Sequence, residues 1–285
     1  MDKLTIMNRM KDSYEVRARH YLTRRIPVIM RLDGKAFHNY TKGLNKPFDE
    51  GLIEDMQKTA IYLCEQIQGA KCAYTQSDEI SILLTDYENL NTEAWFNYEV
   101  QKMTSISASL ATAKFNQLRL LRNVYQVNIG YPDSYEYDIV DEIDIQNQKL
   151  ANFDSRVFSI PKDDVANYFL ARQLDAEKNS ISMLAQSLYS HKELHGKHGG
   201  EMQEMCFQKG HNWNDLHFSK KRGSFIIKNT YWNDELIDED ENYIKTSTIT
   251  HKKTYEISKD IKIRTKWEVI ETPMRFNESH FKQWL

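Results

Sequence analysis

Two short acidic motifs, each beside an apolar run, most constrain how this chain can fold. Asp33 ends the mostly apolar segment 26–33, and Asp78 comes just before the apolar segment 79–84. Both segments have the length and composition of buried strands, and one segment of helix length separates them. The pattern therefore predicts that two carboxylates from distant positions meet at one sheet edge. Carboxylate oxygens beside a loop that begins with glycine suit Mg²⁺ bound to a triphosphate.

The predicted elements follow the order β-α-β-β-α-β and then a further helix. This is the ferredoxin-like pattern of an α+β fold with an antiparallel sheet. Only two residues separate the second strand from the third, which indicates a hairpin, and Asp163 and Asp164 are expected to cap the last helix. The expected strands are 26–33, 71–76, 79–85 and 156–160, and the expected helices are 4–22, 50–68, 95–121 and 164–190.

The same order is found in the catalytic palm of many nucleotide polymerases and cyclases. We therefore interpret residues 1–190 as a palm-like catalytic domain in which 118–152 is an insertion. Residues 191–285 are expected to form a C-terminal extension that packs on the palm and contributes RNA contacts. Strand-like pieces are expected there at 255–257 and 261–270.

The distribution of charge permits a basic face although the net charge of the 285 residues is −3. Twelve acids fall in two blocks, 133–144 and 234–241, and neither block contains lysine or arginine. Without these acids the chain would carry a charge of +9. A basic face for phosphates is therefore possible, although ordinary solvated surfaces explain the charge equally well.

Three cysteines without a C-x-x-C pair indicate reduced thiols and neither a disulfide framework nor a zinc site. No apolar run approaches the roughly 20 residues that a membrane span requires, and residues 1–21 contain no apolar signal-peptide core. We therefore expect a cytoplasmic protein that has no membrane segment. No Walker loop and no G-x-S-x-G motif supports a P-loop enzyme or a hydrolase.

Six short motifs stand out along the chain: Arg31-Leu32-Asp33-Gly34, Phe37-His38, Lys46-Pro47, Gln76-Ser77-Asp78-Glu79, Phe153-Asp154-Ser155-Arg156-Val157 and Arg172-Gln173. Together they resemble the tRNA-histidine guanylyltransferase superfamily, and in particular its guanylyltransferase-like branch of 3′-to-5′ polymerases. Enzymes of this kind add nucleotides to the 5′ end of tRNA, and the resemblance covers roughly residues 5–225.

The resemblance implies a site that binds two Mg²⁺ ions and a nucleoside triphosphate such as GTP or ATP. Asp33, Gly34 and Asp78 would bind the metal ions. Glu79 would join the two aspartates as a third catalytic acid, although strand alternation should turn it away from Asp78. The remaining residues expected to bind the nucleotide are Lys35, Ala36, Phe37, His38, Lys46, Ser77 and Asn179.

Several of these residues also have plainer interpretations. Backbone N–H groups of the loop from Gly34 to His38 would cradle phosphates as a nest does. Phe37 would stack on a base or fill the core, and His38 would contact phosphate or remain a solvated loop residue. The residues expected to contact RNA are Arg24, Arg25, Lys220, Lys221 and Arg222.

One helix departs from the eukaryotic guanylyltransferases, which carry His-Ile-Asn-Asn-Leu-Tyr-Asn-Thr there. The run 177–184 retains Asn179 but lacks the histidine and the tyrosine, as the guanylyltransferase-like branch also does. The resemblance therefore favours template-dependent 3′-to-5′ addition at the 5′ end and acceptor stem of tRNA, in repair or maturation. It also implies ATP activation of 5′-monophosphate ends and a homotetramer.

Three alternatives remain open from the sequence. The first is a tRNA-histidine-specific guanylyltransferase with the same core, against which the altered helix speaks. The second is a nucleotide cyclase built on the same palm, and the third is a catalytically inactive RNA-binding module.

Overall fold

The computed structural model describes residues 3–128, 149–233, 236–237, 243–244 and 262–285. Most of the predicted insertion, the first acidic block and the expected strand at 255–257 lie outside the described residues. Helix α4 continues to Asn128, past residue 118, where the insertion was expected to begin.

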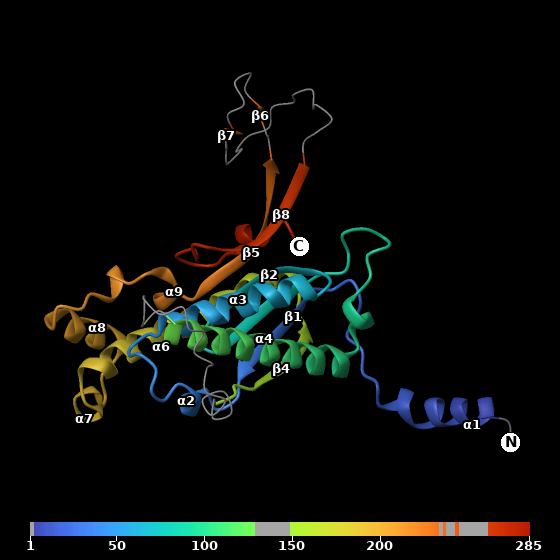
Figure 1. The fold of residues 1–285 in the computed structure, drawn as a ribbon, viewed down its shortest axis with the longest axis horizontal. Helices are drawn as coiled ribbons and strands as arrows, with labels where there is room; N and C mark the ends of the chain where they lie inside the picture. Colours follow the sequence, from blue (N-terminus) through green and yellow to red (C-terminus); the bar gives the residue numbers. More distant parts are fainter. Residues whose placement is uncertain (1–2, 129–148, 234–235, 238–242, 245–261) are drawn as a thin grey trace.

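A six-stranded antiparallel sheet in the order β4-β1-β3-β2-β5-β8 forms the centre of the fold (Figure 1). Its first four neighbours, β4-β1-β3-β2, have the arrangement that a β-α-β-β-α-β chain produces. The predicted α+β fold is therefore confirmed. The strands are β1 (Val28–Gly34), β2 (Ala70–Gln76), β3 (Glu79–Leu84), β4 (Phe153–Ser159), β5 (Ser224–Asn233) and β8 (Lys262–Ile270), with β6 (Leu236–Ile237) and β7 (Tyr243–Ile244) paired separately.

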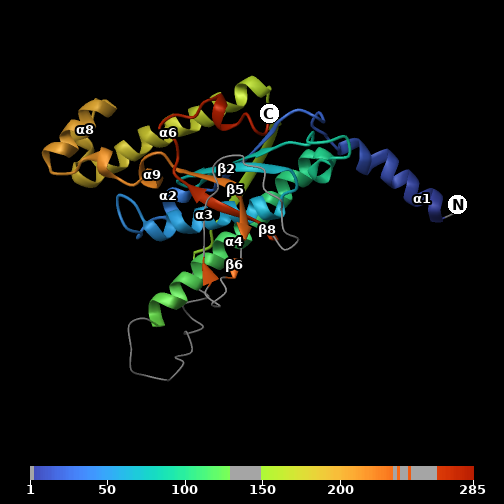
Figure 2. The ribbon, with the colours of Figure 1, turned by 90° about the horizontal axis from the view of Figure 1, so that it is seen from above.

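Alternation along β1 decides which helices cover each face of the sheet. Val28, Met30 and Leu32 are buried with side chains of α3 and α4, whereas Ile29 is buried with side chains of α6. Figure 2 shows α6 on one side of the sheet and α3 and α4 on the other. The bounds are α3 (Glu50–Gln66), α4 (Val100–Asn128) and α6 (Lys162–Leu188).

The C-terminal region adds two strands, β5 and β8, to the sheet formed by β1 to β4. Strand β5 pairs with β2, and β8 pairs with β5 as an edge strand. Phe276 and Phe281 pack with Phe169 of α6 in one buried cluster. The short elements between α6 and β5 are α7 (His191–Leu194), α8 (Gly199–Gln208), η4 (Trp213–Asp215) and α9 (Phe218–Lys221), and η5 (Glu278–His280) follows β8.

Two predicted helices differ in detail from the observed ones. The segment expected as one helix at 4–22 is α1 (Lys3–Met10), a π turn and a 3₁₀ turn, η1 (Lys11–Glu15) and η2 (Val16–Ala18). None of these three elements buries a residue, and α1 projects away from the sheet (Figures 1 and 2). The segment expected at 95–121 is a 3₁₀ turn, η3 (Trp95–Tyr98), followed by α4.

The prediction that Asp163 and Asp164 cap α6 is wrong, because they lie two and three positions after the N-cap. Pro161 occupies the N-cap, and Asp163 and Asp164 lie in the first turn. Their charges still favour the helix, because negative side chains interact well with the N-terminal end of the helix dipole. Among the described helices, none is long and apolar enough to cross a membrane. Cys64, Cys72 and Cys206 are buried free thiols.

Gly223, the residue before β5, allows a test of how β5 joins β2 in the sheet. Its φ of +75° is one that side chains disfavour, and an added Cβ would lie 2.6 Å from the Thr75 carbonyl oxygen. We expect Gly223→Ala to lower the free energy of unfolding by about 1–3 kcal/mol, measured by urea denaturation. Gly200→Ala is the control, because nothing lies within 4 Å of its Cβ position. Equal midpoints for the two variants would contradict this account of the junction.

Candidate active site

Asp33 and Asp78 meet at one end of the sheet. Asp33 pairs in register with Glu79, the first residue of β3, and Asp78 occupies the turn directly before it. The Gly34 N–H donates to the Asp78 carbonyl oxygen at 3.1 Å, which ties the end of β1 to that turn. Ser77 bends the turn with a φ of +49° and donates its hydroxyl to the Asp78 carboxylate at 2.9 Å.

The electrostatics of this end favour a bound cation. Burial raises the pKa of Asp78, and the negative charge of Asp33 raises it further. The hydroxyl of Ser77 opposes this shift by hydrogen bonding to the charged form. A cation between the two carboxylates would relieve both their mutual repulsion and the cost of burying charge.

Glu79 is balanced by two arginines instead. Its side chain is almost fully buried, and its oxygens lie 2.7 Å from Nη2 of Arg31 and 2.9 Å from Nε of Arg172. Burial raises the pKa of Glu79, while the positive charges of Arg172 and Arg31 lower it. Arg172 also contacts Asp175 at 2.6 Å. In this arrangement Glu79 fixes the two guanidinium groups beside the aspartates.

The loop after Asp33 offers fewer free backbone donors than its sequence predicts. The N–H groups of Gly34 and Lys35 are already used, the second by the Asn152 carbonyl oxygen at 2.8 Å. In the part of the chain that the structure describes, no acceptor is assigned to the N–H groups of Ala36, Phe37 and His38. These three groups open the short helix α2 (Phe37–Tyr40), so they are the donors that a phosphate could use.

The ring of Phe37 belongs to the core, as its plainer interpretation predicted. It packs against Tyr40, Phe115 and Phe153 with centroid distances of 4.9 to 5.7 Å. A Cβ on Gly34 would lie 2.2 Å from this ring, so glycine is required there. A nucleotide could therefore contact Phe37 only through its backbone, whereas His38 is exposed on the same turn.

A cavity of about 340 Å³ is lined by residues from four separate segments of the chain. Ser77, Asn179, Lys220 and Lys221 all line it, and the rest of its wall comes mainly from the start of α3 and from α6. Lys46 is exposed on the loop that leads into α3 and does not line the cavity. The mixture of amide, hydroxyl and apolar groups suits a nucleoside.

The cations expected to contact RNA have different surroundings. Arg24 pairs with Asp86 at 2.5 Å and lies before the start of β1, at the opposite end of that strand from Asp33. The backbone N–H of Arg25 donates to the same Asp86 side chain at 2.8 Å. These two residues therefore anchor the chain before β1, and their contact with RNA stays a prediction.

The three basic residues before β5 also have internal partners. Lys220 pairs with Glu50 of α3 at 2.7 Å, and Lys221 donates to the Asn214 carbonyl oxygen at 2.5 Å. Burial lowers the pKa of Lys221, and the neighbouring Arg222 lowers it further. Arg222 itself is only 7% exposed, so a direct RNA contact by its side chain would require the chain to move.

Sequence reasoning named Lys35 but missed two lysines beside it. A groove of about 530 Å³ lies beside the loop from Gly34 to His38, and its lining includes Lys35, Lys42 and Lys149 together with Asn39 and Asn152. Among the described residues, no carboxylate lines this groove. The polar Lys42-Gly43 pair was a sequence signal for Lys42, whereas Lys149 comes close only through the path of the chain into β4.

The residues at this end of the sheet fit a magnesium ion that also binds the phosphates of a nucleotide. Two carboxylates and the Gly34 carbonyl are hard oxygen donors, which Mg²⁺ prefers. Among the described residues, no three histidine, cysteine or acidic side chains gather as a metal site. Mg²⁺ commonly takes one or two carboxylates and completes its shell with phosphates and water, so this donor set fits a metal–nucleotide complex.

The different surroundings of the acids predict different effects on stability. We expect Glu79→Gln to lower the free energy of unfolding by about 3 kcal/mol, because it removes the buried negative charge that Arg31 and Arg172 share. Asp33→Asn should change it little, since that side chain is 38% exposed and its closest cation lies 4.0 Å away. Urea denaturation in EDTA measures both. Equal losses would show that Glu79 does not hold the arginines in place.

Comparisons with known proteins agree with this geometry. The family model described as "Thg1: tRNAHis guanylyltransferase" matches residues 7–161. Among curated proteins, the tRNA(His) guanylyltransferase of Kluyveromyces lactis is 28% identical over 70% of this chain and 81% of its own. An uncharacterized protein, R259 of Acanthamoeba polyphaga mimivirus, is 25% identical over 78% of this chain and 74% of its own.

Solved structures extend the similarity to almost the whole chain. A bacterial tRNA(His) guanylyltransferase (Thg1)-like protein in complex with ATP is 40% identical, with a TM-score of 0.71 and coverage of 98% of this chain and 96% of its own. A complex of such a bacterial protein with GTP gives 38% identity and a TM-score of 0.69, covering 99% and 97%. This chain therefore belongs to the tRNA(His) guanylyltransferase family and is a nucleotidyltransferase.

Proposed function

We propose that this enzyme adds nucleotides to the 5′ end of tRNA, with Asp33 and Asp78 as the catalytic acids. The observation that carries the proposal is the meeting of these two carboxylates beside the N–H groups of residues 36–38, which have no acceptor among the described residues. The similar bacterial structures are complexes with ATP and GTP, which supports nucleoside triphosphates as substrates of this chain too.

Each group of residues in the site would have a separate role. Asp33, Asp78 and the Gly34 carbonyl would hold two Mg²⁺ ions, whose bound form supplies charge neutralisation and activates a hydroxyl nucleophile. The N–H groups of residues 36–38 would bind the triphosphate, and the exposed His38 and Lys46 would add polar contacts to it. Asn179 and Ser77 would contact the nucleoside from the wall of the cavity.

Two forms of the activity are distinguished by what selects the added base. The names of the curated relatives favour addition of guanylate to tRNA-histidine, which the sequence had suggested only as an alternative. Template-dependent 3′-to-5′ addition, with repair of truncated 5′ ends, is the second candidate. The altered run 177–184 and the 40% identity to a bacterial guanylyltransferase-like protein support it.

RNA would approach the sheet end over cationic surface. Lys35, Lys42 and Lys149 of the groove lie beside the loop after Asp33, and Lys220 and Lys221 lie at the cavity. Such contacts would read phosphates and shape, leaving base choice to pairing. Activation of 5′-monophosphate ends by ATP, a homotetrameric assembly and a cytoplasmic location stay predictions.

Removal of either aspartate should abolish nucleotide addition. We expect Asp33→Ala and Asp78→Ala to reduce transfer from a labelled NTP to 5′-truncated tRNA by at least about a thousandfold, because each removes a ligand of the metal–nucleotide complex. Circular dichroism should show a folded protein in both. Extension at near wild-type rates in Mg²⁺ would refute the assignment of the two acids.

The choice of nucleotide separates the two forms of the activity. Purified enzyme is given 5′-truncated tRNA-histidine and a second tRNA, with the base opposite the missing position varied, and each NTP alone. Addition of guanylate to tRNA-histidine whatever the opposing base identifies a tRNA-histidine guanylyltransferase. An added nucleotide that follows the opposing base in both tRNAs identifies template-dependent addition, and a cyclic product without RNA would identify a cyclase.

A further inference from the structure

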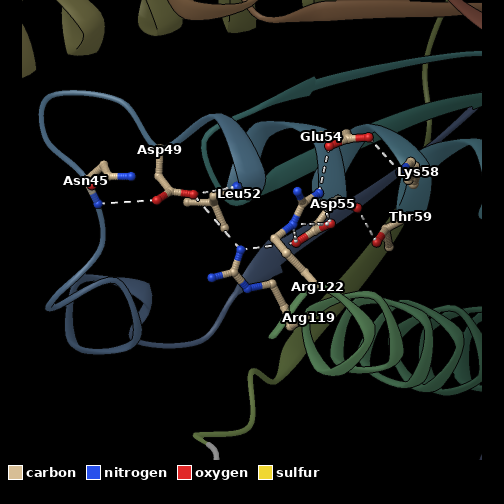
Figure 3. Close-up of polar contacts among 9 residues, drawn as sticks. All are labelled: Asn45, Asp49, Leu52, Glu54, Asp55, Lys58, Thr59, Arg119 and Arg122. Atoms are coloured by element: carbon tan, nitrogen blue, oxygen red, sulfur yellow. Dashed lines mark hydrogen bonds and ion pairs between the residues drawn. The ribbon is translucent and has the colours of Figure 1, made fainter. Parts of the chain in front are cut away.

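A buried ion-pair network joins α3 to α4 on the face of the sheet opposite α6 (Figure 3). At its centre is Asp55 of α3, which is 1% exposed. Arg119 of α4 donates to one of its oxygens at 3.1 Å, and Arg122, one turn later, donates to both at 2.7 to 3.2 Å. Two arginines therefore share one buried carboxylate, although their other contacts differ.

Arg119 reaches two further segments of the chain. Its Nη1 lies 4.0 Å from a carboxylate oxygen of Asp49. Burial raises the pKa of Tyr40, and the nearby positive charge of Arg119 opposes that rise. The Tyr40 ring packs on Phe115, one turn before Arg119 on α4, at a centroid distance of 5.8 Å. Arg119 is itself 7% exposed, so these interactions are formed in a largely water-free environment, where charge pairing is strong.

Asp49 organises the loop between α2 and α3. One carboxylate oxygen caps α3 by accepting from the Leu52 N–H at 2.7 Å, and the other accepts from the Asn45 N–H at 3.2 Å (Figure 3). The second contact draws residues 45–49 into a compact turn that carries Lys46. Asp49 and Leu52 also line the cavity with Ser77 and Asn179.

Tyr40 ends the short helix whose first N–H groups face no internal acceptor among the described residues. Its ring packs on Phe37 at 4.9 Å and on Phe115 at 5.8 Å. Arg119 therefore pairs with the body of α3 through Asp55, lies 4.0 Å from the cap of α3 at Asp49, and acts electrostatically on Tyr40 at the end of α2. A guanidinium can make several such contacts at once because its donors point in fixed directions.

We propose that Arg119 is a positioning residue for nucleotide binding, which holds the loop from Gly34 to His38 and the wall of the cavity in register with each other. This inference rests on the proposed function, since it assumes that a nucleotide spans these two parts. Arg119 does not line the cavity, so it acts through Tyr40 and Asp49.

Arg122 is the matched control that the chain provides. It donates to Asp55 through Nε and Nη2 and to Glu54 at 2.8 Å. Among the described residues its hydrogen-bond and ion-pair partners all lie on α3, so its loss weakens the α3–α4 contact and leaves Tyr40 and Asp49 in place. Both arginines contribute to stability, but only Arg119 links the two parts of the nucleotide site.

The experiment measures the equilibrium affinity of the full chain for GTP with Mg²⁺ and without RNA, together with urea denaturation. We expect Arg119→Gln to raise the Kd for GTP about tenfold, equivalent to about 1.4 kcal/mol. Arg122→Gln should leave the Kd within about twofold of wild type, a difference below about 0.5 kcal/mol, although it also lowers the free energy of unfolding. Arg119→Lys should give an intermediate Kd, since one ammonium group cannot bridge all three partners.

A double-mutant cycle tests the route of the effect. Asp49→Asn should weaken GTP binding by itself and should be non-additive with Arg119→Gln, but additive with Arg122→Gln. If both arginine variants lose affinity in proportion to their loss of stability, the role of Arg119 is structural and the inference is wrong. Failure of the wild-type chain to bind GTP would overturn the proposed function, and the inference with it.

Discussion

Repulsion between two carboxylates at one sheet end is the constraint on which the site depends. Asp33 and Asp78 lie where β1 meets the β2–β3 turn, and backbone hydrogen bonding holds them there. A third acid, Glu79, is adjacent but is neutralised by two arginines. The cation closest to Asp33 is Arg31 at 4.0 Å, so the two aspartates are less neutralised than Glu79, and this arrangement favours an external cation.

The rest of the fold keeps that end of the sheet rigid. The side chains of α6 bring Arg172 to Glu79, and its neighbour Gln173 donates to the Pro273 carbonyl oxygen and accepts from the Phe276 N–H. The Arg172-Gln173 pair therefore joins the site to the C-terminal segment. On the other face, the Asp55 network fixes α3 against α4, and Arg119 extends it to the loops that follow Asp33. Two independent sets of polar contacts thus support the same site from opposite faces.

The positions of the cationic side chains show which of them stabilise the fold and which are available to a ligand. Arg24, Arg31, Arg119 and Arg172 all form ion pairs with acids that are nearly fully buried. The lysines of the groove beside the loop from Gly34 to His38 share its lining with no acid among the residues that the structure describes. Since a paired arginine has little left to offer a phosphate, we expect that lysines make most of the electrostatic contact with RNA.

The sequence by itself determined the order of the first four strands and of the helices between and after them, the end of the sheet that carries Asp33 and Asp78, and the family. It did so because strand and helix periodicities are local and because the acidic motifs stand at strand ends. It did not predict β5, which joins the sheet beside β2. Only the tertiary structure decided which charged groups remain available. The burial of Arg222, the pairing of Glu79 with Arg31 and Arg172, and the reach of Arg119 to Tyr40 and Asp49 all join positions far apart in the chain. Periodicity in the sequence indicates which face of a helix or strand a residue occupies. It does not indicate which distant residue packs against that face.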